Sequence, residues 1–120
     1  LMNIGEQIAA ICDVAIPRAE QREAVLAQLH ATGHEVIHLS YAQLHAFAGN
    51  MLELRNADGD RVVAMSEQAW NSLDDRQREL LAENGRIVYS PIKTIETSAG
   101  GSVRCMLAEI HLPEQGEPQA

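Results

Sequence analysis

Apolar runs and amphipathic stretches alternate along the chain. Residues 7–16 form a mostly apolar run that ends at Pro17, which predicts a buried strand. Residues 18–32 carry apolar side chains at helical spacing, and Gly33 supplies a C-terminal stop, so this segment is predicted to be a helix. Residues 34–40 alternate between apolar and polar positions, as a strand does. The order strand, helix, strand indicates an α/β fold.

The middle of the chain predicts a hairpin. Residues 41–48 are interpreted as a short helical or irregular connection that ends at Gly49. Residues 50–55 are predicted to be a strand, and Asn56-Ala57-Asp58-Gly59 is a turn signal. Residues 60–65 then return as the partner strand.

A long helix is predicted to follow this hairpin. It spans residues 67–84, where Ser66 provides an N-cap and apolar residues recur on one side. The pair Asp74-Asp75 is interpreted as part of its solvated face. Residues 86–89 then form another predicted strand, before Pro91.

The last third of the chain contains a loop rich in small residues. Residues 97–102 read Thr-Ser-Ala-Gly-Gly-Ser, which favours a flexible loop. This loop leads into an apolar segment, 103–112, that is predicted to be a strand with Cys105 near its start. Residues 113–120 form a polar tail.

The predicted elements repeat. Residues 29–33 and 81–85 are both helix ends followed by short strands, and they lie 52 residues apart. The same spacing carries Gly49-Asn50 onto Gly101-Ser102, so the chain is predicted to contain two related units. Rotation of one unit onto the other would bring Asn50 and Cys105 into one site. A duplicated scaffold without a site would explain the repeat equally well.

Composition and charge narrow the function classes. The chain has 120 residues, enough for one domain with a core, and only 3% aromatic residues, so the core must be aliphatic. The net charge of −8, with no basic patch, argues against nucleic acids and anionic membrane surfaces as partners. No signal peptide and no apolar run long enough to span a bilayer are present, so we expect a cytoplasmic protein.

Cysteine is the strongest candidate for chemistry. Cys12 and Cys105 lie far apart, and neither these residues nor the five histidines show metal-ligand spacing, so no metal and no cofactor are expected. Cys105 is either an inert core residue or a nucleophile. For a nucleophile, Arg104 would stabilise the thiolate, and the N–H groups around Gly100 and Gly101 would face developing negative charge. No histidine is obviously placed as its acid or base.

Three segments carry a resemblance to a known superfamily. Residues 49–54, the helix from Glu67, and above all Gly-Gly-Ser-Val-Arg-Cys-Met at 100–106 resemble the C-terminal part of guanidino-group-modifying enzymes. This superfamily includes arginine deiminases, dimethylarginine dimethylaminohydrolases and amidinotransferases, and the sequence looks most like the bacterial citrulline-utilisation hydrolases. The resemblance covers residues 1–112. It implies a partial pentein, or α/β-propeller, containing about two of the five ββαβ modules.

The resemblance also implies a mechanism. Cys105 would attack the guanidino or ureido carbon of a small substrate such as arginine or citrulline and form a covalent adduct, with a histidine as acid and base and with carboxylates holding the cationic end. Asn50 matches a strand start near the family's active site. Gly100, Gly101 and Ser102 would line the site beside Cys105.

One departure from the family pattern matters. The catalytic histidine of the family belongs to a short motif that falls just before the strand with which this chain begins, at Leu1. We therefore expect the nucleophile-bearing part of an enzyme, inactive alone and completed by missing N-terminal modules. The other hypothesis is a catalytically silent α/β module that self-associates. Under both hypotheses the chain forms only part of a pentein ring and would expose strand edges, so a homo-oligomer is expected.

Overall fold

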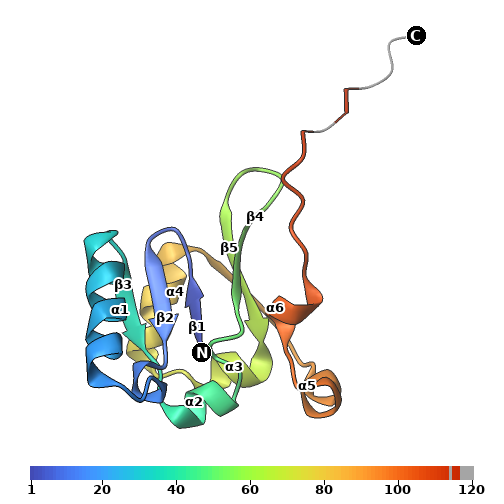
Figure 1. Cartoon of the computed structure of the whole chain (residues 1–120). Helices are drawn as coiled ribbons and strands as arrows, with labels where there is room; N and C mark the ends of the chain where they lie inside the picture. The colour runs from blue at the N-terminus through green and yellow to red at the C-terminus, as the bar shows by residue number, and fades with distance from the viewer. Residues whose placement is uncertain (114, 117–120) are drawn as a thin grey trace.

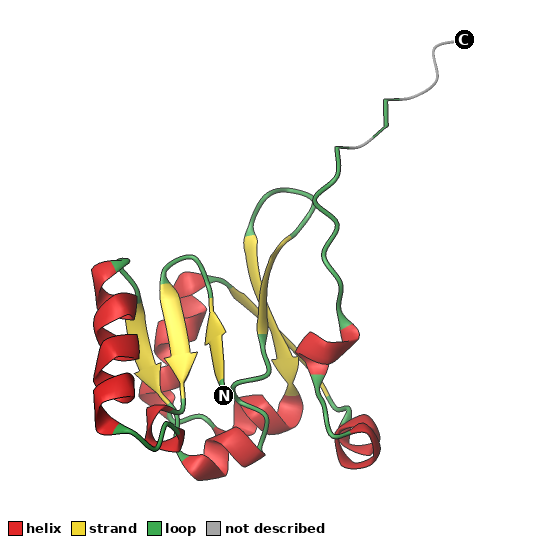
Figure 2. Ribbon diagram, viewed as in Figure 1, coloured by secondary structure: helices red, strands yellow, loops and turns green. Residues whose placement is uncertain are grey.

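Two three-stranded sheets with flanking helices make up the chain in the computed structural model, which describes residues 1–113, 115 and 116 (Figures 1 and 2). In Figure 1 the first sheet and its helix lie on one side, and the second sheet and the last two helices lie on the other. The segment after the last helix extends away from the body of the molecule.

The first unit comprises five elements and one 3-10 turn. In chain order these are β1 (Met2–Ile4), β2 (Ile8–Ile11), the 3-10 turn η1 (Asp13–Ala15), α1 (Ala19–Ala31), β3 (Glu35–His38) and α2 (Tyr41–His45). β1 pairs with β2 in antiparallel fashion, and β3 pairs with β2 in parallel. Since a parallel pair needs a crossover, α1 provides the connection.

The second unit repeats this plan and adds a final short helix. In chain order its elements are β4 (Leu52–Arg55), β5 (Arg61–Ser66), α3 (Glu67–Ser72), α4 (Asp75–Asn84), β6 (Arg86–Ser90), α5 (Lys93–Ala99) and α6 (Val103–Met106). Here too the first two strands are antiparallel and the third is parallel to the second. The α/β class and the two units of related topology are therefore confirmed.

A single aliphatic cluster joins the two units. It contains Ile8 and Ile37 from the first sheet and Val63 and Met65 from the second, together with Met51 from the connection between them. Each of these side chains is at most 7% exposed. Because both sheets contribute to one core, the units stabilise each other.

Polar side chains add two further links between the units. The Gln77 amide on α4 donates to the carbonyl of His38 at 2.9 Å and accepts from the Gln43 amide at 2.7 Å. The Glu53 carboxylate on β4 accepts from the N–H of Glu6 at 3.1 Å and from the Asn84 amide at 2.8 Å. Glu53 therefore has a structural role at the contact between the two units.

The long helix predicted over residues 67–84 is in fact two helices. The chain leaves helical geometry at Leu73, and α4 begins after Asp74. Asp74 is therefore an N-cap rather than part of a solvated helix face. Its carboxylate accepts from the N–H of Gln77, and the Gln77 side chain accepts from the N–H of Asp74. This reciprocal capping box favours a new helix start over continuation of the first helix.

Three other element predictions are wrong. The strand predicted over 7–16 is shorter, because β2 ends at Ile11 and the 3-10 turn η1 begins at Asp13. Residues 97–99 are the end of α5 rather than a flexible loop, and Gly100 ends that helix in the left-handed region with φ +68°. The strand predicted from Cys105 is instead the one-turn helix α6, and residues 107–112 form no strand. An apolar run alone does not make a strand, and no described strand pairs with this segment.

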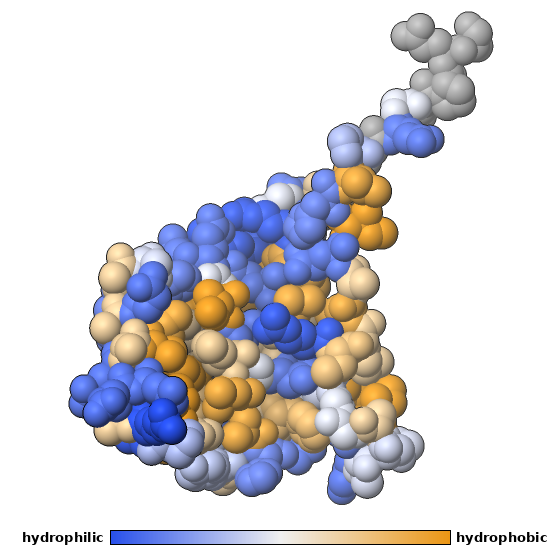
Figure 3. Space-filling model, in the orientation of Figure 1, coloured by the Kyte–Doolittle hydropathy of each residue, from blue (hydrophilic) through white to orange (hydrophobic). Residues whose placement is uncertain are grey.

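The surface is unevenly apolar. The extended segment after α6 carries exposed Ile110 and Leu112, and exposed side chains of Leu1, Met2 and Ile4 lie on or next to the outer strand β1 (Figure 3). Among the described residues, no helix is both long and apolar enough to cross a membrane. Of the predicted tail, residues 114 and 117–120 lie outside the described part of the chain, and Pro113, Gln115 and Gly116 are exposed.

Candidate active site

Asn50 and Cys105, which lie 55 positions apart, meet in the structure. The Asn50 amide nitrogen donates to the Cys105 sulfur at 3.2 Å. The Asn50 amide oxygen accepts from the main-chain N–H of Arg104 at 3.0 Å. One side chain therefore contacts both the thiol and the backbone that carries it.

A strained turn positions Asn50. Phe47, just after α2, has φ +64° and is the one described residue other than glycine with positive φ. The N–H of Phe47 donates to the carbonyl of Leu44, and the N–H of Asn50 donates to the carbonyl of Phe47. A bulky residue in this region is costly and is held there by its surroundings. The turn fixes Asn50 at the start of the segment that leads into β4.

Cys105 is held by α6, which packs against β5. The Arg104 guanidinium donates to the side-chain oxygen of Asn3 on β1 at 3.2 Å, so the same turn is also tied to the first unit. Asn3 is itself buried. Side chains from the first unit and from the connecting segment thus hold the turn that carries the thiol.

The surroundings of Cys105 favour its thiolate. The hydrogen bond from the Asn50 amide is the largest cause that lowers the pKa of the Cys105 thiol, followed by the main-chain N–H of Ser102. The positive charge of Arg104 lowers this pKa further but contributes less. Cys105 is exposed, whereas Cys12 is completely buried in the core. A low-pKa, accessible thiol is the state in which cysteine is reactive.

Gly100 and Gly101 differ in what they do for the site. A Cβ at Gly101 would lie 3.0 Å from the sulfur of Cys105 and 3.2 Å from its Cβ, which is tighter than normal contact. A Cβ at Gly100 would meet nothing within 4 Å, but its φ of +68° favours glycine. Gly101 therefore leaves space for the thiol, and Gly100 permits the turn.

This difference gives a matched pair of variants. We expect Gly101→Ala to displace the thiol from Asn50 and to slow alkylation of Cys105 at pH 7.5 by about threefold, the value of one modest hydrogen bond. Gly100→Ala should lower stability by roughly 1 kcal/mol, the cost of a left-handed alanine, with alkylation of the folded protein unchanged. Site-resolved mass spectrometry after iodoacetamide treatment measures the first effect, and thermal unfolding measures the second. Equal slowing in both variants would contradict the assignment of the crowding to Gly101.

Ser102 is placed beside Cys105, but its side chain is turned inward. Its hydroxyl is fully buried and donates to a carboxylate oxygen of Glu96 at 2.8 Å. Its carbonyl accepts from the N–H of Cys105 at 3.0 Å. Ser102 therefore contacts the cysteine through its main chain, and its hydroxyl does not face an open surface.

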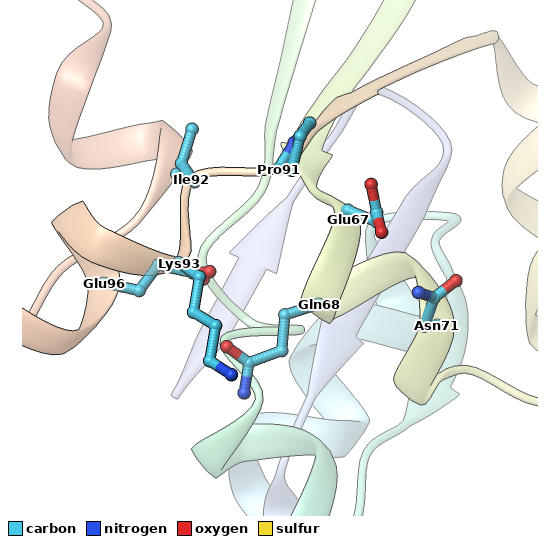
Figure 4. Close-up of a pocket in the computed structure, with 7 residues that line it drawn as sticks. All are labelled: Glu67, Gln68, Asn71, Pro91, Ile92, Lys93 and Glu96. Atoms are coloured by element: carbon cyan, nitrogen blue, oxygen red, sulfur yellow. The ribbon is translucent and has the colours of Figure 1, made fainter.

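Two cavities lie near these residues. One of about 200 Å³ includes Asn50 in its wall, and the others that line it are Leu1, Leu44, Phe47 and Gly49. A larger one of about 410 Å³ lies between α3 and the start of α5 and has Glu96 in its wall (Figure 4). Neither Cys105 nor Asn50 lines the larger cavity. The smaller cavity therefore borders Asn50, and Cys105 lines neither of the two.

Comparison with known proteins decides the family. The family described as N,N dimethylarginine dimethylhydrolase, eukaryotic, matches residues 1–112. The chain belongs to this family. No curated protein and no solved structure matches the chain. The family lies within the guanidino-modifying pentein superfamily, so the resemblance to that superfamily is confirmed at this level.

Within the described part of the chain, Asn50 is the side chain that is hydrogen-bonded to the Cys105 thiol, and no acidic or basic side chain is hydrogen-bonded to it. Among the described residues, no histidine is hydrogen-bonded to Cys105. His34 bonds to Thr32 and to the carbonyl of Gly5, and His38 bonds to Asp13. No group of three or more potential metal ligands occurs in the described part of the chain.

Sequence reasoning missed three residues around the site. Phe47 carries no signal for positive φ, because aromatic residues rarely adopt it. Asn3 lies in a short strand with nothing to indicate a partner more than 100 residues away. Glu96 lies on a segment that was not assigned to a helix. Glu96 directly precedes the predicted loop at 97–102, and nothing in the sequence pairs it with Ser102.

Proposed function

We propose that Cys105 is the nucleophile of a hydrolase that acts on guanidino groups. The observation that carries this proposal is the hydrogen bond from Asn50 to an exposed, low-pKa cysteine in a chain of the dimethylarginine dimethylhydrolase family. In the proposed ring, this chain supplies about two of five pentein modules. The superfamily assignment and the repeated unit support that arrangement.

The proposed reaction has two halves. The Cys105 thiolate forms a bond to the guanidino carbon, and the bond from that carbon to an amine breaks as the departing nitrogen takes a proton. An amidino thioether remains on the enzyme. Water then adds to the same carbon and gives up a proton, the carbon–sulfur bond breaks, and the thiolate returns. For N,N-dimethylarginine, the substrate class suggested by the family's name, the products are dimethylamine and the ureido acid citrulline.

Arginine is a second substrate candidate, because the same carbon would lose ammonia instead of dimethylamine. Citrulline itself, with a ureido carbon, is the third, and is suggested by the likeness of residues 100–106 to citrulline-utilisation hydrolases. The three differ only in the groups attached to the attacked carbon. Product analysis therefore separates them.

Acid–base catalysis is proposed to come from a group other than the described histidines, since none contacts Cys105. We therefore expect this chain to form a bond to an electrophile through Cys105 but not to turn over substrate alone. Further modules of the ring would contribute the missing acid–base group and the carboxylates that hold the substrate cation.

The test compares the wild-type chain with Cys105→Ala. At pH 7, iodoacetamide should label Cys105 severalfold faster than a free cysteine derivative, because more of the thiol is ionised. Cys105→Ala should remove the label entirely, and buried Cys12 should stay unlabelled until the chain is unfolded. Incubation with N,N-dimethylarginine, arginine or citrulline should release neither amine nor ammonia from either protein. Release by the wild type alone would show that the chain holds its own acid–base group.

A second candidate is a catalytically silent module that self-associates. The exposed apolar side chains Leu1, Met2 and Ile4 at the outer strand β1 favour it, because such a face is suited to burial against a second copy. An unreactive Cys105 together with a concentration-dependent dimer in sedimentation would support this candidate and contradict the nucleophile proposal.

A further inference from the structure

Glu96 occupies an unusual position for a carboxylate. It is 4% exposed and is the buried residue of α5, whereas its neighbour Ile95 is 39% exposed. Burying a carboxylate is costly unless hydrogen bonds compensate, and one of its oxygens has no hydrogen-bond partner among the described residues. A helix that buries its acid and exposes its isoleucine is not optimised for stability alone.

The other carboxylate oxygen of Glu96 is connected to Cys105 through Ser102. It accepts the hydrogen bond from the buried hydroxyl of Ser102 at 2.8 Å. Ser102 in turn contacts Cys105 through its main chain. Its carbonyl accepts from the N–H of Cys105 at 3.0 Å, and the main chain of Ser102 is the second-largest cause that lowers the pKa of the thiol.

The connection between Glu96 and Ser102 crosses two adjacent glycines. Gly100 and Gly101 separate α5 from α6, and glycine has the largest backbone freedom of any residue. The hydroxyl of Ser102 has Glu96 as its one hydrogen-bond partner among the described side chains. This is the one described side-chain hydrogen bond that ties the buried Ser102 to α5 across the two glycines.

The larger cavity does not offer a replacement for the carboxylate. Figure 4 shows Glu96 on α5, while the side chains of Gln68 from α3 and Lys93 from α5 extend toward each other in the gap between the two helices. No hydrogen bond joins any other residue in that wall to Ser102 among the described contacts. Loss of the carboxylate would therefore leave the hydroxyl without its partner.

We propose that Glu96 is a positioning residue for Cys105, acting through the buried hydroxyl of Ser102. The inference rests on the proposed function, in which Cys105 is the nucleophile. Glu96 does not touch the reacting atoms. It fixes the main chain of Ser102, which sets the orientation of the cysteine relative to Asn50.

The test measures the pH profile of Cys105 alkylation by iodoacetamide with site-resolved mass spectrometry. Glu96→Ala and Ser102→Ala should each shift the profile to higher pH and slow labelling at pH 7.5 by about threefold. The double variant should be no slower than either single variant, because both remove the same bond. Glu96→Gln retains an acceptor for the hydroxyl and should restore most of the wild-type rate. Glu67→Ala, in the wall of the same cavity, is the matched control and should leave the profile unchanged.

Labelling of Cys12 distinguishes a local effect on Cys105 from unfolding of the chain. Its thiol is completely buried, so its labelling reports global opening within the same sample. If Glu96→Ala exposes Cys12, Ser102→Ala and Glu96→Gln decide the question in a folded protein. Unchanged profiles in folded variants, or additive slowing in the double variant, would overturn the positioning role while the nucleophile stands. A wild-type Cys105 without enhanced labelling would instead overturn the proposed function.

Discussion

Replacing Asn50 with alanine is expected to slow alkylation of Cys105 at pH 7.5 by about tenfold, which is the upper range for the loss of one hydrogen bond. The Asn50 amide is the largest influence that lowers the pKa of this thiol. Its removal raises the pKa, so a smaller fraction of the thiol is ionised at any pH below that value. The same change removes the acceptor of the Arg104 N–H, which loosens the turn as well.

The sign of the pH dependence is fixed by this mechanism. The slowing should be largest below the wild-type thiol pKa and should disappear at high pH, where both proteins are fully ionised. A pH series of iodoacetamide labelling measures it. A rate difference that persists unchanged at high pH would show that Asn50 acts on access to the sulfur and not on its ionisation.

Two further variants separate the roles of the Asn50 side chain. Asn50→Asp keeps the acceptor for Arg104 but replaces the donor to the sulfur with a negative charge. It should therefore raise the pKa of Cys105 further than alanine does. Asn71→Ala, an exposed asparagine on α3 away from the thiol, should have no effect. If Asn50→Asp labels like the wild type, the hydrogen bond to the sulfur is not what activates it.

The largest effect on stability is expected for Gln77→Leu, which should lower the free energy of unfolding by about 2–4 kcal/mol, as for loss of a buried hydrogen-bond network. Leucine fills a similar volume but leaves the carbonyl of His38 and the N–H of Asp74 without their partners. Gln43 loses its contact to α4 at the same time. Chemical denaturation measures the change.

Gln68→Leu provides the control for this prediction, since Gln68 lies exposed on α3 and has no described hydrogen bond. It should change stability by less than about 0.5 kcal/mol, as surface substitutions do. Hydrogen exchange adds a second readout, because Gln77→Leu should lower protection at the start of α4 and the end of β3 together. A loss confined to α4 would mean that Gln77 serves as a helix cap and not as a link between the units.

Much of the architecture was accessible from local patterns. Helix α1, the hairpin of β4 and β5, and the strands β3 and β6 follow from apolar spacing and turn residues, which act over a few positions. The repeat predicted that Asn50 and Cys105 would meet. It relates two units of the chain, and corresponding positions in related units can lie side by side even when they are far apart in the sequence. The contact between their side chains is present.

The errors arose where hydrogen bonds compete with apolar spacing. Leu73 and Leu80 keep a helical spacing across residues 67–84, but the capping box at Asp74 starts a new helix there. The segment after Gly101 is apolar like a buried strand, yet Cys105 lies in a helical turn held by Asn50 and Ser102. Glu96 could not be predicted as buried, since its partner hydroxyl comes into range only when the glycine turn folds.

The contacts of the Arg104-Cys105 turn have a consequence for how this protein tolerates change. Asn3 and Asn50 hold that turn from the first unit and from the connecting segment, so the contact that lowers the pKa of the Cys105 thiol depends on the docking of the two units. The reactivity of Cys105 then reports how well the two units are docked. Substitutions far from the sulfur that loosen the docking would lower the reactivity of Cys105 before either sheet loses a strand. Selection for a reactive cysteine therefore also maintains a rigid junction between two units that are each too small to be rigid alone.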